Sequence, residues 1–194
     1  TDSYRLAVRD LPNTSVLPGD QSVLVPSRAL AELGRLLGDN DALVQFGERD
    51  ATFKVGDVTI STRLIEGDFP NYKGLIPSNQ PNRLTVERET LLEAVRRVRL
   101  LAQESTPVRL AMSADGLELI AMTQDAGQAH EEVEASYEGE ELTVAFNPEY
   151  LIDGIEVSVG DQVVLETVDS LKPVLLRTPG DEDFLYLLMP VRVT

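Results

Sequence analysis

The feature that most constrains this chain is one order of elements that recurs three times, from about Ser22, Arg83 and Glu141. Each copy reads as a strand, an amphipathic helix, a two-stranded hairpin and a closing strand, because strand periodicity and helix periodicity alternate in the same order. Turn signals such as Gly56-Asp57 stand near the joints. Repeats of this kind are typical of modules that stack on shared sheets and helices, so we predict a repetitive α+β fold.

Composition limits the class of protein. With 194 residues, of which 42% are hydrophobic, the chain is expected to be globular and to form one large or two small domains. It has no apolar run long enough for a membrane span and no signal peptide at its start, which predicts a soluble, cytoplasmic protein. The absence of cysteine excludes disulfides and thiolate chemistry. The net charge of -16 argues against tight nucleic-acid binding by bulk electrostatics, so any DNA contact must be local.

The start of the chain resembles the end of a module. Residues 1–8 read as a strand, but no complete module precedes them and there is no initiating methionine. We therefore expect a fragment. The ladder partners of this strand are expected to be missing or to come from another molecule.

The outer faces of the first two expected helices carry arginines, at Arg28, Arg35, Arg96 and Arg97, and the second also exposes Leu100. The predicted buried stripes are Ala29, Leu30, Leu33, Leu36 and Leu37 in the first helix and Leu91, Val95, Val98, Leu101 and Ala102 in the second. The arginines could bracket phosphates, because the planar guanidinium matches phosphate oxygens. Composition alone favours the alternative, that they are ordinary solvated helix residues, because four arginines among 33 acidic residues are a weak signal of nucleic-acid binding.

The third expected helix differs because its outer face is wholly acidic. Its inward residues are Tyr150, Leu151 and Ile155, and its outward residues are Glu149, Asp153 and Glu156. Charge clusters of this type usually face water.

Catalytic motifs are absent from the sequence. It has no G-x-S-x-G elbow, no phosphate-binding G-x-x-x-x-G-K-[ST] loop and no G-x-G-x-x-G turn, so we expect no enzyme activity and no cofactor. The single histidine, His130, lies in an acidic strand. Alternation places His130 and Glu132 on one face of this strand and Glu131 and Val133 on the other. We expect a solvated edge strand there, with no metal site.

Three distant segments nevertheless carry a resemblance to a known family. TDSYRLAVRD at the start, RLIEGDFPNYKGLIP at 63–77 and YLLMPVRVT at 186–194 resemble the bacterial sliding clamp, the beta subunit of DNA polymerase III. FNPEYLIDG and DSLKPVLL extend the resemblance through the last third of the chain. It covers the whole chain and keeps the order and spacing of the family.

The resemblance implies a ring made of two crescents, with helices lining a central hole, antiparallel sheets forming the outer wall, and duplex DNA encircled without sequence specificity. This chain would supply the second half of the middle domain, residues 1–77, and the complete last domain, residues 78–194. The four arginines would face DNA. The ring interface to the other crescent of the homodimer would contain Leu100, Leu101, Glu131, Glu132 and Glu134.

The resemblance also implies a docking pocket for short motifs of the form Gln-Leu-x-Leu-Phe. The partners would be the polymerase III alpha subunit, the clamp loader, other polymerases and repair proteins. The expected pocket residues are Thr1, Ser3, Tyr4, Arg5, Leu6, Pro70, Leu75, Pro173, Leu187, Met189 and Val191. Gly74 departs from the basic residue common at its position. The alternative reading is a repetitive α+β interaction scaffold unrelated to replication, which would be indifferent to such a peptide.

Overall fold

The computed structural model of the chain describes residues 1–12, 14, 16–17, 19, 21–101, 106–123 and 127–193. Ala102 of the predicted helix stripe lies outside these residues. The chain divides into a larger unit, Thr1–Asp10 with Tyr72–Thr194, and a smaller unit, Leu11–Asn71. The predicted boundary between residues 77 and 78 stays a prediction. In the described part of the chain, no helix is both long and apolar enough to cross a membrane.

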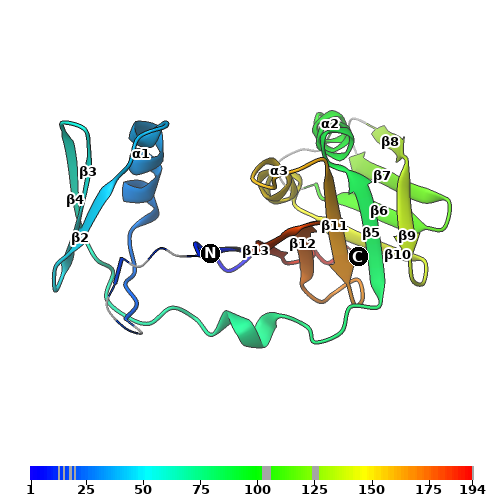
Figure 1. Cartoon of the computed structure of the whole chain (residues 1–194). Coiled ribbons are helices and arrows are strands. Elements are labelled where there is room, and N and C mark those ends of the chain that lie inside the picture. Colours follow the sequence, from blue (N-terminus) through cyan, green and yellow to red (C-terminus); the bar gives the residue numbers. More distant parts are fainter. Residues whose placement is uncertain are drawn as a thin grey trace. The chain divides into compact units, whose positions relative to one another are not determined.

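The larger unit contains two modules and the first strand of the chain (Figure 1). Its elements are β1 (Arg5–Arg9), the 3-10 helix η1 (Tyr72–Leu75), β5 (Asn82–Glu87), α2 (Arg88–Arg99), β6 (Val108–Ser113), β7 (Gly116–Thr123), β8 (Gly127–Val133), β9 (Ala135–Glu138), β10 (Leu142–Phe146), α3 (Pro148–Glu156), β11 (Gln162–Thr167), β12 (Val174–Thr178) and β13 (Asp181–Leu188). The predicted order of strand, helix, hairpin and closing strand is present in both modules.

The two modules of the larger unit exchange their first strands. β5 pairs with β11 of the following module, and β10 pairs with β6 of the preceding one. The strands therefore form a six-stranded sheet, β1-β13-β12-β11-β5-β9, and a four-stranded sheet, β10-β6-β7-β8. Neighbouring strands in both sheets pair antiparallel. One continuous core of buried side chains from both modules holds the sheets and helices together.

The helices α2 and α3 lie side by side in the larger unit and contact each other (Figure 1). The predicted core residues Leu91, Val95, Leu151 and Ile155 are each 0% exposed. Leu100, at the end of α2, is 85% exposed, as predicted. The mixture of helices and antiparallel sheets confirms the predicted fold class.

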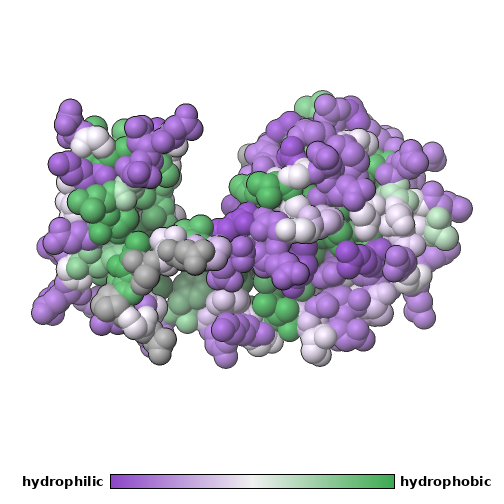
Figure 2. Space-filling view, in the orientation of Figure 1, coloured by the Kyte–Doolittle hydropathy of each residue, from purple (hydrophilic) through white to green (hydrophobic). Residues whose placement is uncertain are grey.

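The smaller unit contains α1 (Ser27–Leu37) over a three-stranded sheet of β2 (Leu43–Phe46), β3 (Asp50–Val55) and β4 (Val58–Arg63). The opening strand predicted near Ser22 is reduced to a single bridge between Leu24 and Ile65. The predicted stripe of α1 is mostly not buried, because one short sheet covers little of the helix. Only Ala29 is buried, whereas Leu30 is 47% exposed. Figure 2 shows hydrophobic side chains gathered on one face of this unit.

The first strand of the chain has a partner within the same chain, which corrects the expectation that its partners are absent. β1 pairs with β13 in antiparallel register, with Leu6 opposite Leu187. β1 lies at one end of the six-stranded sheet. The closing strand ends at Leu188, so Met189 and Val191 lie just beyond it.

Candidate functional site

The pairing of β1 with β13 brings the first and last segments of the predicted pocket together. Leu6 and Leu187 form a buried cluster with Leu175, and Tyr72, Ile76 and Met189 pack against it. Leu6 is 5% exposed and Leu187 is 2% exposed. These two leucines therefore form the interior of a small apolar cluster, while the partly buried Met189 lies closer to solvent.

Two backbone hydrogen bonds hold the segment that follows β13. The N–H of Met189 donates to the carbonyl oxygen of Tyr4 over 2.9 Å. The N–H of Val191 donates to the carbonyl oxygen of Ala145, in β10, over 2.8 Å. This segment is thus fixed both to Tyr4, just before β1, and to the four-stranded sheet, and the Met189 side chain packs against the cluster.

Arg5 connects the start of the chain to α3. Its guanidinium forms ion pairs with Asp2, at 3.0 Å, and with Asp153, and it lies 4.2 Å from the ring centroid of Tyr150. Partial burial lowers the pKa of Arg5, but hydrogen bonds to Asp153 and Asp2 outweigh this effect and raise the pKa above its ordinary value. Tyr4 stacks on the same Tyr150 ring, at 6.2 Å between centroids.

The turn before β1 is held by local hydrogen bonds. The Thr1 hydroxyl donates to the Arg5 carbonyl oxygen over 2.7 Å, and the Ser3 N–H donates to the Thr1 hydroxyl. Ser3 has a positive φ of 75°, which is uncommon for a residue other than glycine. Thr1 and Ser3 are exposed and adjoin Tyr4, and their place in the pocket wall stays a prediction.

Leu75 and Pro173 line a second hollow of the larger unit, a cavity of about 480 Å³. Gly74 and Lys172 line it too, and the Lys172 ammonium lies 3.7 Å from an Asp169 carboxylate oxygen. Pro70 belongs to the smaller unit and is exposed there. Ten of the eleven predicted pocket residues thus lie in the larger unit, and their assembly into one pocket, with or without Pro70, stays a prediction.

Three of the four arginines expected to face DNA are engaged in ion pairs. Arg35 pairs with Glu32 at 2.8 Å on α1, where Arg28 is exposed. Arg96 pairs with Glu156 of α3 at 2.5 Å. The Nε atom of Arg97 lies 2.9 Å from a carboxylate oxygen of Glu131 in β8. The outward face of α3, predicted to be acidic and solvated, is thus partly neutralised by arginines.

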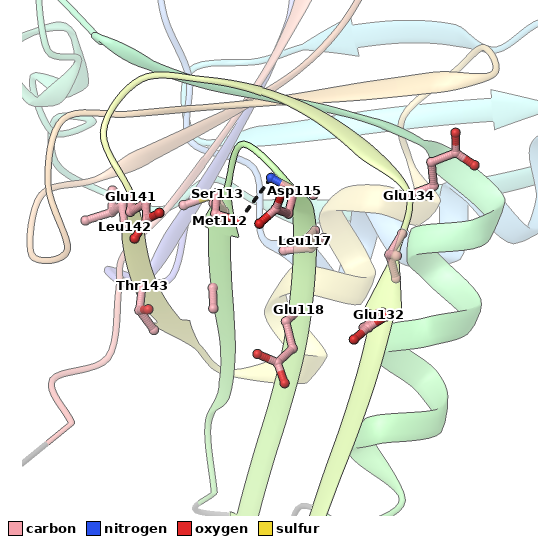
Figure 3. Close-up of a pocket in the computed structure, with 13 residues that line it drawn as sticks. Met112, Ser113, Asp115, Leu117, Glu118, Glu132, Glu134, Glu141, Leu142 and Thr143 are labelled. Atoms are coloured by element: carbon pink, nitrogen blue, oxygen red, sulfur yellow. Dashed lines mark hydrogen bonds between the residues drawn. The ribbon is translucent and has the colours of Figure 1, made fainter.

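The expected ring-interface residues lie around β8, which is an edge strand of the four-stranded sheet, as predicted. The three glutamates do not form one patch. Glu131 is directed toward α2 through its ion pair with Arg97. Glu132 lies opposite Glu118 of β7 on the other face, and Glu134 points away from both (Figure 3). Leu101 is partly buried, next to the exposed Leu100.

Glu118, Glu132 and Glu134 also line a cavity of about 820 Å³ at one end of this sheet (Figure 3). His130 lies beside it on the same strand face as Glu132, as strand alternation predicts, with Nδ1 2.6 Å from a Glu118 carboxylate oxygen. Among the described residues, no group of three or more histidine, cysteine or acidic side chains is arranged to hold a metal ion.

Comparison with known proteins identifies the family. A model of the central domain of the DNA polymerase III beta subunit matches residues 1–71, and a model of its C-terminal domain matches residues 73–192. The chain belongs to the DNA polymerase III beta subunit family. This confirms the resemblance on which the site expectations were based.

Relatives within the DNA polymerase III beta subunit family align with the whole chain. The beta sliding clamps of Staphylococcus aureus and Bacillus subtilis are each 34% identical, over 197 and 200 residues. A structure of Caulobacter crescentus pol III beta superposes with a TM-score of 0.90 at 33% identity, covering 100% of this chain and 53% of that one. These two alignments include 99% of this chain. The chain spans only about half, 52%, of the length of the curated relatives.

Three residues at the candidate site were not expected there from the sequence. Tyr150 was assigned to the core and Asp153 to a solvated face, yet both contact Arg5. Lys172 was not considered, although it lines the cavity with Leu75 and Pro173. The position of Lys172 next to Pro173 in DSLKPVLL was the only sequence signal for it. No sequence pattern connects Arg5 to residues of α3.

Proposed function

We propose that the chain is the C-terminal part of a beta sliding clamp, an accessory processivity factor without catalysis of its own. The complete protein would form a homodimeric ring around duplex DNA and act in the cytoplasm. The observation that carries the proposal is the match to two domain models of one family in consecutive order, together with a TM-score of 0.90 over the whole chain.

Peptide docking is the activity that this part of the clamp would contribute. The site is the apolar cluster of Leu6, Leu187 and Met189 together with the neighbouring cavity of Leu75 and Pro173. Methionine suits a pocket shared by several partners, because its flexible side chain repacks around different ligands. A related clamp, from Bartonella birtlesii, has a structure bound to griselimycin. The proposed ligands are Gln-Leu-x-Leu-Phe-like motifs of polymerases, including the polymerase III alpha subunit, of the clamp loader and of repair proteins.

The structure indicates which substitution tests docking best. Leu187 is 2% exposed, so Leu187→Asp would bury an unpaired charge and destabilise the fold. Met189 is partly exposed and follows β13, so Met189→Asp adds the charge at the surface of the cluster. Met122 provides a matched control, because it is 46% exposed on β7, in the other sheet.

The test is fluorescence anisotropy of a labelled Gln-Leu-Asp-Leu-Phe peptide against the chain and the two variants. We expect saturable binding by the parent and by Met122→Asp, and a loss of at least about tenfold with Met189→Asp, since an apolar anchor contributes a few kcal/mol. Equal binding by all three proteins, or none by the parent, would contradict the proposed pocket.

The DNA-facing role of Arg28, Arg35, Arg96 and Arg97 and the ring interface at Leu100, Leu101, Glu131, Glu132 and Glu134 belong to the same proposal. Arginines scattered over an otherwise acidic surface support it, because an enclosed duplex needs only weak phosphate contacts in order to slide. The exposed edge of β8 and the 85% exposed Leu100 support an interface with a second crescent.

A further inference from the structure

The last turn of α2 is basic and lies against the acidic face of α3. Arg96 and Arg99 are one helical turn apart, so they share the face of α2 that adjoins α3. Arg96 Nη2 lies 2.5 Å from Glu156 Oε1, and Arg99 forms an ion pair with Glu149. Each arginine on this face therefore has its own carboxylate from the neighbouring helix.

Arg97 is directed to the opposite side of α2. Its guanidinium contacts both carboxylate oxygens of Glu131 in β8, with Nε at 2.9 and 3.1 Å, and its Nη1 lies 3.4 Å from Glu93. Hydrogen bonding to Glu131 raises the pKa of Arg97 above its ordinary value. Two carboxylates and a bidentate geometry bind Arg97 more firmly than the single partners of Arg96 and Arg99.

The carboxylate partners of Arg96 and Arg99 can be replaced by another anion. The side chains of Arg96 and Glu156 are 50% and 43% exposed, and those of Arg99 and Glu149 are 44% and 50% exposed. Ion pairs at this exposure contribute little to stability, because water and salt compete for both charges. A phosphate, like a carboxylate, offers a guanidinium two acceptor oxygens. It can therefore bind Arg96 or Arg99 in place of Glu156 or Glu149.

We propose that α3 competes with DNA for the arginines of α2: a phosphate binds Arg96 or Arg99 by displacing Glu156 or Glu149. The proposed DNA-facing set on α2 is thereby revised. Arg96 keeps that role, Arg99 joins it, and Arg97 becomes a structural link between α2 and β8 through Glu131. The inference rests on the proposed function, because it takes the α2–α3 surface as DNA-facing. The carboxylates weaken the binding of each arginine to the DNA phosphates, which suits a protein that must slide along DNA.

A double-mutant cycle tests this competition. The probe is a labelled DNA duplex of about two helical turns at about 25 mM salt, where phosphate contacts are strongest. The variants are Glu149→Gln/Glu156→Gln, Arg96→Gln/Arg99→Gln and the combination of all four. The control is Glu138→Gln/Glu140→Gln, which removes the same two charges from exposed positions in and after β9. Thermal unfolding of each variant establishes that it is folded.

We expect Glu149→Gln/Glu156→Gln to raise the association constant about 3- to 10-fold, which corresponds to two weak surface pairs, and the control to raise it less. The gain should disappear when Arg96 and Arg99 are also replaced. A gain that persists without the arginines, or that the control matches, would overturn the competition while leaving DNA binding at α2 intact. If Arg96→Gln/Arg99→Gln leaves binding unchanged, the DNA-facing assignment of α2 itself is wrong. Lack of binding by both the parent and the glutamine variant also overturns the inference.

Discussion

Gly154 fixes the distance between α3 and β13. A Cβ atom at this position would lie 2.5 Å from the ring of Tyr186, well inside van der Waals contact. Tyr186 is 4% exposed, and its hydroxyl donates to the carbonyl oxygen of Tyr150 over 2.7 Å. Burial raises the pKa of Tyr186, so it remains a neutral donor near neutral pH. The absent side chain of Gly154 thus lets α3 present Tyr150 to Arg5.

We predict that Gly154→Ala destabilises the larger unit by about 1–3 kcal/mol, because the added methyl group overpacks a buried ring. Gly34 is the matched control, since it also lies in a helix but a Cβ added there would meet no described atom within 4 Å outside its own helix backbone. Gly34→Ala should stabilise α1 by about 0.5–1 kcal/mol through helix propensity. Urea unfolding followed by circular dichroism measures both effects. A neutral Gly154→Ala would contradict this account of the packing.

At the scale of the element, the helices begin in different ways. α2 begins after Glu87, whose carboxylate accepts hydrogen bonds from the N–H groups of Glu89 and Thr90. α3 begins after Asn147, whose side chain accepts from the N–H of Glu149, and Pro148 occupies its first turn. α1 follows Pro26 and has no side-chain cap. The two helices of the larger unit, α2 and α3, are therefore the two with capped starts.

We predict that the cap of α2 makes stability depend on pH in acid. Hydrogen bonds from Thr90, of its side chain first and its backbone second, hold the pKa of Glu87 below the ordinary value of 4.5. Because its pKa is lowered in the folded chain, the Glu87 carboxylate stabilises the fold at pH values above its ordinary pKa. This contribution is lost as the pH falls through the lowered pKa. Glu87→Gln should therefore show a shallower fall in melting temperature below about pH 4.5 than the parent. Parallel melting curves for the two proteins would argue against this role.

At the scale of the molecule, the six-stranded sheet ends in a short open edge at β1. The Tyr4 carbonyl oxygen accepts from the N–H of Met189, and the Asp10 N–H donates to the carbonyl oxygen of Asp183. The alternate residues Arg5, Ala7 and Arg9 therefore direct their backbone groups away from β13. The N-terminal turn covers Arg5, because its carbonyl oxygen accepts from Thr1 and Asp2 and its N–H donates to Asp2. The remaining backbone groups on this edge are those of Ala7 and Arg9.

We predict weak self-association of the chain through this edge at high concentration. Ala7→Pro removes an outward N–H without removing a ladder bond to β13, so it should shift the equilibrium toward monomer. Ala7→Ser keeps the N–H and serves as the control. Sedimentation velocity over a concentration series measures the effect. A parent protein that stays strictly monomeric would contradict the prediction.

Much of the candidate site was expected from the sequence only because of the family resemblance. Alternation correctly placed His130 apart from Glu131 on β8, and helix periodicity correctly exposed Leu100. Neither pattern showed that Leu6 would lie opposite Leu187. The predicted burial of Leu30 and Leu36 was wrong, because periodicity identifies an apolar face but does not supply the surface that covers it.

The sequence by itself determined the two modules of the larger unit, the apolar faces of α2 and α3 and the strand alternation. Those features depend on backbone geometry over a few residues, which the local order of side chains is enough to specify. Only the tertiary structure decided the exchange of β5 and β10 between modules, the pairing of β1 with β13 and the partners of the arginines. Arg96 and Glu156 are 60 residues apart, and Arg5 and Asp153 are 148 apart. Contacts at such separations are selected by packing of the whole core and by chain closure, which no local pattern encodes.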